Sequence, residues 1–401
     1  MIKEQNTEKQ KYACWLCSVP GVGDKTIDRL RKLCPDVEGI YRGGEKLWEK
    51  VLSERQMSSV REFASRTDPD AVFEALLRKN ISFVSVEEEG YPKRLKVIPD
   101  SPFGLFYRGR LPEEDILSVA VVGARECSAY GSYVAQAIGA ALGEHQVQVI
   151  SGMARGIDGI SQEAALEAGG SSFGVLGCGV DICYPKSNQE LYEKLAKQGG
   201  IISAYPPGTE PRPQNFPPRN RIVSGLADVL IVVEARNKSG TLITVDMALE
   251  QGREVFVVPG RVTDRLSDGC NRLLKQGAGV FLSPEDFLRE FGVGEKAAQK
   301  AGNGSSGEKS IDPDDAENTE GMLAVPRKQV KLAPELTAVY QILEPEPQDV
   351  IRIGEKLAET MGEKTDEKKL MVLLMRLCME KLAVQVTPGS FALLQFGPNQ
   401  V

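Results

Sequence analysis

The stretch "LSVAVVGARECSAYGSYVAQAIGAALGEHQVQVIS", Leu117 to Ser151, contains two short apolar runs separated by a helical segment. The runs 117–123 and 146–151 have the length and composition of fully buried strands. The segment between them shows helical spacing of its apolar residues and ends at a histidine. Strand and helix in alternation predict a parallel sheet with helices on both faces.

The same alternation continues along the chain. The runs "SSFGVLG" (171–177), "DVLIVVEA" (228–235) and "REVFVVPG" (253–260) are also typical of buried strands. Two earlier runs, "ISFVSV" (81–86) and "GLFYRG" (104–109), indicate that the sheet extends beyond this set. We therefore expect an α/β fold whose centre is an extended Rossmann-like parallel sheet.

Composition divides the chain into four predicted parts. Residues 1–70 are mostly helical, and residues 71–294 hold the sheet. Residues 295–330 are rich in Gly, Ser, Asp and Glu, which predicts a flexible linker because such a segment cannot repay the entropy of ordering. Residues 331–401 predict three helices and a short hairpin, the winged-helix pattern, which could contact either DNA or a protein.

The N-terminal part contains "SVPGVGDKTIDRLRKL" (18–33), a Gly-Val-Gly turn that leads into an amphipathic helix. Helix-hairpin-helix units use such turns, because the backbone amides at a helix N-terminus can meet a phosphate. A small helical domain with a glycine-rich turn explains the same residues without any ligand. A single turn does not separate these two interpretations.

Charge and residue counts restrict the function classes. The chain has 401 residues, with 56 Asp and Glu against 49 Lys and Arg, so its net charge of -7 argues against sequence-blind coating of nucleic acid. Phosphate binding depends on the local field in a cleft, however, so a nucleic-acid site is not excluded. The single histidine, His145, excludes a metal site built from several histidines.

The expected compartment is the reducing cytoplasm. Eight cysteines in 401 residues are too few for a disulfide scaffold. No window approaches 18 uninterrupted apolar residues, a length taken from membrane-spanning helices of about 20 residues, so no membrane insertion is expected. The N-terminus "MIKEQNTEKQK" lacks the apolar core of a secretory signal.

Loops that follow the predicted strands combine glycines with cations. Ligands of open parallel sheets bind at the carboxyl ends of the strands, where these loops lie. The residues expected to bind there are Arg125, Gly152, Arg155, Lys186, Lys238, Ser239, Gly240 and Thr241. Neither a GxGxxG fingerprint nor a Walker loop is present, so no nucleotide cofactor is expected.

The stretch "FPPRNRIVSG" (216–225) adds an aromatic ring and two guanidinium groups to this set. Arg219 and Arg221 can fork to phosphate oxygens, and Phe216 can stack on a base, which is the combination that binds single-stranded nucleic acid. Asn220 lies between the two arginines. The alternatives are core packing for Phe216 and an ion pair for an arginine, so one of the two arginines could brace the loop by pairing with a carboxylate.

No catalytic constellation is expected. His145 lies at a predicted helix end, where a capping or solvent-exposed role fits best. Cys14 and Cys17 have C-x-x-C spacing, but no second pair at ligand spacing accompanies them, so no metal site is expected. Asp158 and Glu234 lie near the glycine turns without forming an acid/base pair, and fold-supporting hydrogen bonds fit them better.

Seven motifs in consistent order resemble the DNA-processing protein A family, also called Smf. They are "VVGARECSAYG", "VISGMARGIDGISQEAALEAGG", "VLGCGVDICYPKSN", "IISAYPPGTEP", "FPPRNRIVSGLAD", "LIVVEARNKSGTLIT" and "GREVFVVPGRVTDRLSDGCNRLLKQGA". The resemblance covers roughly residues 80–285. It also implies a sterile-alpha-motif-like helical domain before the sheet and a winged helix after it. The sequence departs from the family pattern at Ala124, Glu126, Ser161 and Cys270.

The resemblance implies a protein that binds single-stranded DNA without cutting it, forms a homodimer and loads RecA recombinase during natural transformation. A single-strand-binding protein is a further partner to test. Carried over by position, the family's binding residues fall on Arg125, Lys186, Phe216, Arg219, Asn220, Arg221 and the turn from Ser239 to Thr241.

An enzyme is the alternative from another class. Rossmann-like phosphoribohydrolases also hold a nucleotide phosphate with glycine turns. They carry a Pro-Gly-Gly-x-Gly-Thr turn with a downstream glutamate, whereas the equivalent turn here is "NKSGTLIT" (237–244). The sequence therefore favours a binding protein over this enzyme.

Overall fold

The computed structural model describes residues 2–293, 332–344, 347–362, 366–380 and 382–393. The chain divides into two compact units, residues 1–126 with 138–309 and residues 127–137 with 310–401. The predicted linker, 295–330, lies outside the described residues. Among the described helices, none combines the length and the apolar character needed to cross a membrane.

The larger unit begins with five helices. They are α1 (Ile2–Ser18), α2 (Asp24–Leu33), α3 (Val37–Trp48), α4 (Glu54–Arg66) and α5 (Pro69–Arg78). Local sequence explains several of their starts: Ser53 and Gln56 form a capping box at α4, and Asp68 accepts a hydrogen bond from the Ala71 amide at α5. Trp15 of α1 is fully buried, with the Trp48 ring at 5.8 Å. The expected N-terminal helical region is confirmed.

Nine strands form one sheet in this unit. They are β1 (Ser82–Ser85), β2 (Gly104–Gly109), β3 (Ser118–Val122), β4 (Gln148–Ser151), β5 (Ser172–Val175), β6 (Gly200–Ser203), β7 (Val229–Val232), β8 (Glu254–Val257) and β9 (Gly279–Val280). Their order across the sheet is β1-β2-β6-β5-β4-β3-β7-β8-β9. In this order, each pair of neighbours from β6 across to β9 is parallel. Strand β2 pairs antiparallel with both of its neighbours, β1 and β6.

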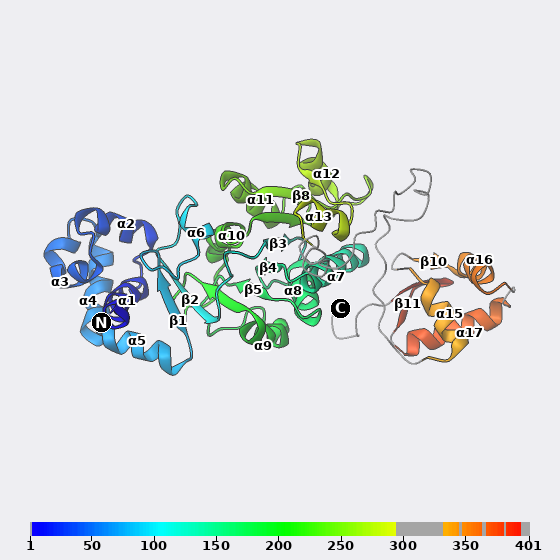
Figure 1. Ribbon diagram of the computed structural model, residues 1–401, viewed down its shortest axis with the longest axis horizontal. Helices are drawn as coiled ribbons and strands as arrows, with labels where there is room; N and C mark the ends of the chain where they lie inside the picture. Colours follow the sequence, from blue (N-terminus) through cyan, green and yellow to red (C-terminus); the bar gives the residue numbers. More distant parts are fainter. Residues whose placement is uncertain (1, 294–331, 345–346, 363–365, 381, 394–401) are drawn as a thin grey trace, which may run out of the picture. The chain divides into compact units, whose positions relative to one another are not determined.

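Helices cover both faces of the sheet, as expected (Figure 1). The helices of the sheet region are α6 (Lys93–Lys96), α8 (Ile157–Glu167), α9 (Gln189–Gln198), α10 (Phe216–Gly225), α11 (Gly240–Glu250), α12 (Asp268–Lys275) and α13 (Pro284–Glu290). Helix α7 (Ala129–Glu144) is divided between the two units, with residues 138–144 in the larger one. Residues of α8 and α9 join the N-terminal helices in one apolar core. Residues of α6, α10, α11 and α12 form a second core on the other face.

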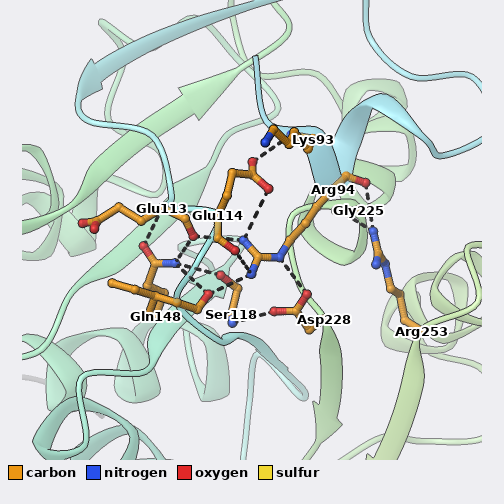
Figure 2. A network of polar contacts seen from close by, with 10 residues as sticks. Lys93, Arg94, Glu113, Glu114, Ser118, Gln148, Gly225, Asp228 and Arg253 are labelled. Carbon is orange, nitrogen blue, oxygen red and sulfur yellow. Dashed lines mark hydrogen bonds and ion pairs between the residues drawn. The ribbon is translucent and has the colours of Figure 1, made fainter. Parts of the chain in front are cut away.

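Partly buried polar contacts fix the amino ends of the central strands (Figure 2). The Arg94 guanidinium of α6 donates to Asp228 Oδ1 at 2.7 Å, just before β7, and to three backbone carbonyls of the segment 113–116. The second oxygen of Asp228 accepts the backbone amide of Ser118 at 2.9 Å. This network lies at the amino ends of β3 and β7, so it stabilises the sheet edge opposite the loops predicted to bind.

The described part of the smaller unit contains the expected winged-helix elements. They are α15 (Pro334–Ile342), β10 (Gln348–Asp349), α16 (Val350–Met361), α17 (Glu367–Met379), β11 (Ala383–Thr387) and β12 (Ser390–Leu393). The three strands form an antiparallel sheet in the order β10-β12-β11. Leucines of all three helices form its core together with Phe391.

Candidate nucleic-acid interface

The order in which the chain adds strands to the sheet reverses between β3 and β7. From β3 the chain proceeds through β4, β5 and β6 on one side, then returns to β7 on the other side. The loops after these two neighbouring strands therefore diverge, which makes a crevice of the kind where open α/β sheets bind ligands. The hydroxyl of Thr241 donates to the carbonyl of Gly123 at 3.2 Å and links the two loops.

Four predicted cations on these loops are exposed to solvent. Arg125 follows β3, Arg155 follows β4, Lys186 follows β5 and Lys238 follows β7. Within the described residues, no acidic side chain lies within 4.0 Å of any of these four. Their charges are therefore available to an anionic ligand at the carboxyl edge of the sheet.

The ring of Phe216 lies at the centre of an aromatic and cationic cluster. Phe216 begins α10 and is half-buried. The guanidinium of Arg125 lies over its ring at 5.6 Å, and the ring of Tyr184 is 5.6 Å away at an interplanar angle of 32°. Tyr184 is 43% exposed. The cluster thus presents an aromatic face beside a guanidinium that makes no ion pair within the described residues. Lys186 follows Tyr184 by two residues.

Arg219 is buried instead of facing solvent, with 5% of its surface exposed. Its guanidinium donates to the carbonyls of Gly152 and Val175, at the ends of β4 and β5, and to Asn220 Oδ1 at 3.1 Å. It also lies over the Phe216 ring at 5.6 Å. Burial lowers the pKa of this guanidinium, and Asp158 partly offsets that effect. Arg219 therefore braces the loops that carry the exposed residues.

Asp158 and Gly152 complete this buried arrangement. The Asp158 carboxylate accepts the Gly152 amide at 3.1 Å. Burial raises the pKa of Asp158, whereas the nearby charge of Arg219 lowers it. A Cβ at position 152 would lie 2.7 Å from both Arg219 Nη1 and Asp158 Oδ2. Glycine is thus needed at 152 because the two charged side chains occupy the space, which supports the fold-supporting role expected for Asp158.

Arg221 points away from this cluster. Its guanidinium donates to the carbonyl of Pro99 at 2.8 Å and lies 3.3 Å from Asp100 Oδ2. The Arg221 side chain is 23% exposed. Both arginines of the "FPPRNR" stretch are thus partnered, one to the sheet and one to the loop before β2, and Asn220 bonds to Arg219.

The turn from Ser239 to Thr241 forms the N-terminus of α11, as the sequence predicts. Ser239 is the N-cap residue, but its side chain makes no capping bond. Its Oγ is buried and has no hydrogen-bond partner among the described residues. Gly240 is exposed. The first amides of α11 are therefore uncapped by Ser239 and open at the same edge as Arg125.

Sequence reasoning missed Tyr184 as a site residue. The signal was an aromatic residue placed between the glycine turn after β5 and Lys186. The structure also keeps Arg155 and Lys238 off the Phe216 ring, over which only Arg125 and Arg219 lie among the described residues. The direct role of each predicted residue in binding remains a prediction.

The other titratable candidates have local explanations. His145 is exposed, and its Nδ1 lies 2.9 Å from the Ala141 carbonyl. Burial raises the pKa of the Cys14 thiol to about 12, so this cysteine is a core residue rather than a reactive one. Glu234 is 1% exposed at the end of β7. Across the described residues, no three His, Cys, Asp or Glu side chains gather as a metal site.

The sequence and the fold of this chain are similar to those of known proteins. A sequence model of the family described as DNA recombination-mediator protein A matches residues 82–292. The DNA processing protein DprA of Streptococcus pneumoniae is 42% identical over 207 residues, which are 52% of this chain and 73% of that protein. Protein Smf of Synechocystis is 33% identical over 303 residues, 72% of this chain and 74% of that protein.

A solved structure agrees with the sequence matches. The X-ray structure of DNA processing protein A from Streptococcus pneumoniae aligns with a TM-score of 0.60 at 32% identity, covering 70% of this chain and 97% of that one. The family match spans more than half of the 401 residues. This protein therefore belongs to the DNA recombination-mediator protein A family, also known as DprA or Smf.

Proposed function

We propose that this protein binds single-stranded DNA at the carboxyl edge of its sheet. The observation that carries the proposal is the Phe216 and Tyr184 ring pair beside the exposed guanidinium of Arg125, which makes no ion pair within the described residues. An exposed aromatic face takes an unstacked base, and a guanidinium beside it takes the adjacent phosphate. Duplex DNA offers no unstacked base, so the arrangement favours a single strand.

Other groups of the same edge supply further phosphate contacts. Lys186 follows Tyr184, and the uncapped N-terminus of α11 offers backbone amides. Arg155 and Lys238 extend the positive field along the edge. We assign Arg219 and Gly152 a supporting role, since the Arg219 guanidinium is occupied by two carbonyls.

The recombination role follows from family membership. The family description names a DNA recombination mediator. We propose that the bound strand is handed to a RecA-type recombinase without being cut, and that the protein acts as a homodimer in the cytoplasm. Natural transformation is the setting that the resemblance implies. Recovery of RecA from host extract by the tagged protein, compared with and without single-stranded DNA, tests the partnership, and no recovery in either condition contradicts it.

Two variants separate the two halves of the binding site. Arg125→Ala should weaken binding of an unstructured oligonucleotide and lower the salt slope of log K by about 0.7, the value for one phosphate contact to a single strand. Phe216→Ala should weaken binding by about 1–3 kcal/mol, the range for loss of one stacked base, with little change in slope. Fluorescence anisotropy at several salt concentrations measures both quantities.

A matched control removes a charge elsewhere. Lys46 is exposed on α3 and does not lie on the binding edge, so Lys46→Ala should leave affinity and slope unchanged. Thermal unfolding of each variant verifies that it is folded. If Arg125→Ala and Phe216→Ala both bind like the wild type at every salt concentration, the site is misplaced.

The phosphoribohydrolase alternative has less support. The enzyme needs a carboxylate that reaches a bound nucleotide, and Glu234, which precedes the turn "NKSGTLIT", is buried with 1% exposure. Release of free base from nucleoside monophosphates, lost in the Glu234→Gln variant, would establish the enzyme instead.

A further inference from the structure

A cavity of about 930 Å³ lies beside the first turn of α10 in the larger unit. One wall is the Gly-Val-Gly turn between α1 and α2, and the opposite wall is α10 with the loop that precedes it. Tyr205, Pro217 and Pro218 give it an apolar lining. Pro217 directly follows Phe216, so the cavity begins where the aromatic cluster ends.

Cations line both walls of this cavity, together with the carboxylates of Asp24, Asp100 and Glu210. Arg212 is exposed on the loop before α10, and no acidic side chain of the described residues lies within 4.0 Å of it. Arg221 lines the same wall, and Lys25 lines the opposite one at the start of α2. Guanidinium and ammonium groups facing each other across an apolar groove suit a phosphodiester chain with its bases against the proline and tyrosine rings.

The carboxylate of Asp100 holds two of these cations. It lies 3.6 Å from Lys25 Nζ and 3.3 Å from Arg221 Nη1, and so bridges the two walls. The Asp100 side chain is 53% exposed. An anion thus already occupies the position between Lys25 and Arg221, where a phosphate of a bound strand would make the same two contacts.

The glycine turn leaves room on its own wall. A Cβ at Gly21 or Gly23 would meet nothing within 4 Å, so the backbone there faces open space. Gly23 is the N-cap of α2 and supplies no side-chain acceptor to the first amides of the helix. Asp24, in the first turn of α2, also lines the cavity, so this wall carries a carboxylate beside Lys25.

We infer that the cavity between α10 and the α1–α2 turn holds the continuation of the single strand bound at Phe216. The N-terminal helices then contribute directly to DNA binding, with Arg212, Arg221 and Lys25 contacting phosphates and Asp100 standing in for a phosphate when no strand is bound. This inference rests on the proposed function, because it extends the same strand beyond the aromatic cluster.

Oligonucleotide length tests the inference. An oligonucleotide of about 4 nucleotides can occupy only the Phe216 cluster, whereas one of about 16 can also fill the cavity, a range that matches known single-strand site sizes. Arg212→Ala should weaken binding of the long oligonucleotide and lower its salt slope by about 0.7, while the short one is unaffected. Arg125→Ala should weaken both, and Lys46→Ala neither.

A variant expected to bind the long oligonucleotide more tightly provides a second test. Asp100 has a positive φ of 51°, a conformation that asparagine also tolerates, so Asp100→Asn removes the charge without straining the backbone. This variant should bind the long oligonucleotide more tightly than the wild type, with a steeper salt slope, because Lys25 and Arg221 become available to phosphate. The affinity for the short oligonucleotide should not change.

The outcomes separate the two proposals. If Arg125→Ala weakens binding while Arg212→Ala and Asp100→Asn leave both lengths unchanged, the cavity does not hold the strand, although the proposed function stands. If Arg212→Ala weakens both lengths equally, Arg212 belongs to the Phe216 cluster and the inference is wrong. If the wild type binds neither oligonucleotide, the proposed function fails and the inference fails with it.

Discussion

Arg219→Ala should destabilise the larger unit strongly, although it removes a residue of the signature expected to bind DNA. The guanidinium of Arg219 is 5% exposed and donates to two buried carbonyls, those of Gly152 and Val175. A buried polar group that loses its partner costs about 1–3 kcal/mol, so two carbonyls give about 2–6 kcal/mol. Arg219→Ala also removes the positive charge that favours the ionised form of the buried Asp158 carboxylate, which keeps its hydrogen bond from the Gly152 amide.

Thermal unfolding followed by circular dichroism measures this loss. At about 2.1 cal/mol/K of unfolding entropy per residue, 1 kcal/mol shifts the Tm of a unit of about 300 residues by about 1.6 °C, so the lower bound of the loss corresponds to about 3 °C. Arg219→Lys should recover only part of the loss, because an ammonium group keeps the charge near Asp158 but cannot replace the planar fork. Arg221→Ala is the matched control, since its guanidinium is on the surface side of α10 and should cost less.

DNA binding by the folded variant supplies the refuting result. If Arg219 acts only through the loops that it braces, Arg219→Ala should weaken binding without lowering the salt slope, measured well below its Tm. A variant with the wild-type Tm and a slope lower by about 0.7 would show that Arg219 contacts a phosphate, and the bracing role would be wrong.

Three further predictions concern stability and reactivity. Gly152→Ala should destabilise the protein in urea unfolding, because its Cβ would lie 2.7 Å from both Arg219 and Asp158, and wild-type stability would contradict that packing. Burial raises the pKa of Asp24, because the folded state disfavours the ionised carboxylate. The resulting loss of folding stability is absent below the unfolded-state pKa of Asp24 and grows as pH rises through its folded-state pKa. Asp24→Asn should therefore be more stable than the wild type at pH 8, a gain that disappears in urea titrations toward pH 4; a gain independent of pH would contradict it. Cys14, with a pKa of about 12, should resist iodoacetamide at pH 8 until the protein unfolds, as read by mass spectrometry.

Much of the fold was predictable because parallel strands are apolar along their whole length. The runs 117–123, 171–177 and 228–235 each contain an observed strand. Strand β6 was missed because "GIIS" has only two large apolar residues beside a glycine pair, too short a run to stand out. The antiparallel direction of β1 and β2 was not predictable, because strand direction depends on pairing partners rather than on apolar pattern.

The division of roles within "FPPRNR" could have been found from helical phase. Arg219 lies three residues before Ile222 and four before Val223, which are both apolar and buried, whereas the residues three and four after Arg221 are Ser224 and Gly225, which show no apolar stripe in the sequence. Two prolines at the start hid this pattern by suggesting a loop. The expectation that one arginine braces the structure is consistent with the geometry. Arg219, however, bonds mainly to backbone carbonyls, and every residue has a carbonyl, so the sequence does not indicate these partners.

Contacts between loops at the sheet edge could not be predicted from the sequence. The placement of Tyr184 against Phe216 depends on how far the loop after β5 reaches toward α10, and 31 residues separate the two in sequence. The cavity beside α10 likewise depends on how the α1–α2 turn faces that helix. Long-range packing of loops carries no local periodic signal.

The central claim is that the carboxyl edge of the sheet binds a single strand in preference to duplex DNA. A fluorescence-anisotropy titration with a labelled unstructured oligonucleotide and with the same sequence as a duplex tests it directly, at two or more salt concentrations. The single strand should bind more tightly than the duplex at each salt concentration, with affinity falling as salt rises. Equal or tighter binding of the duplex, or no binding of the single strand at low salt, would contradict it.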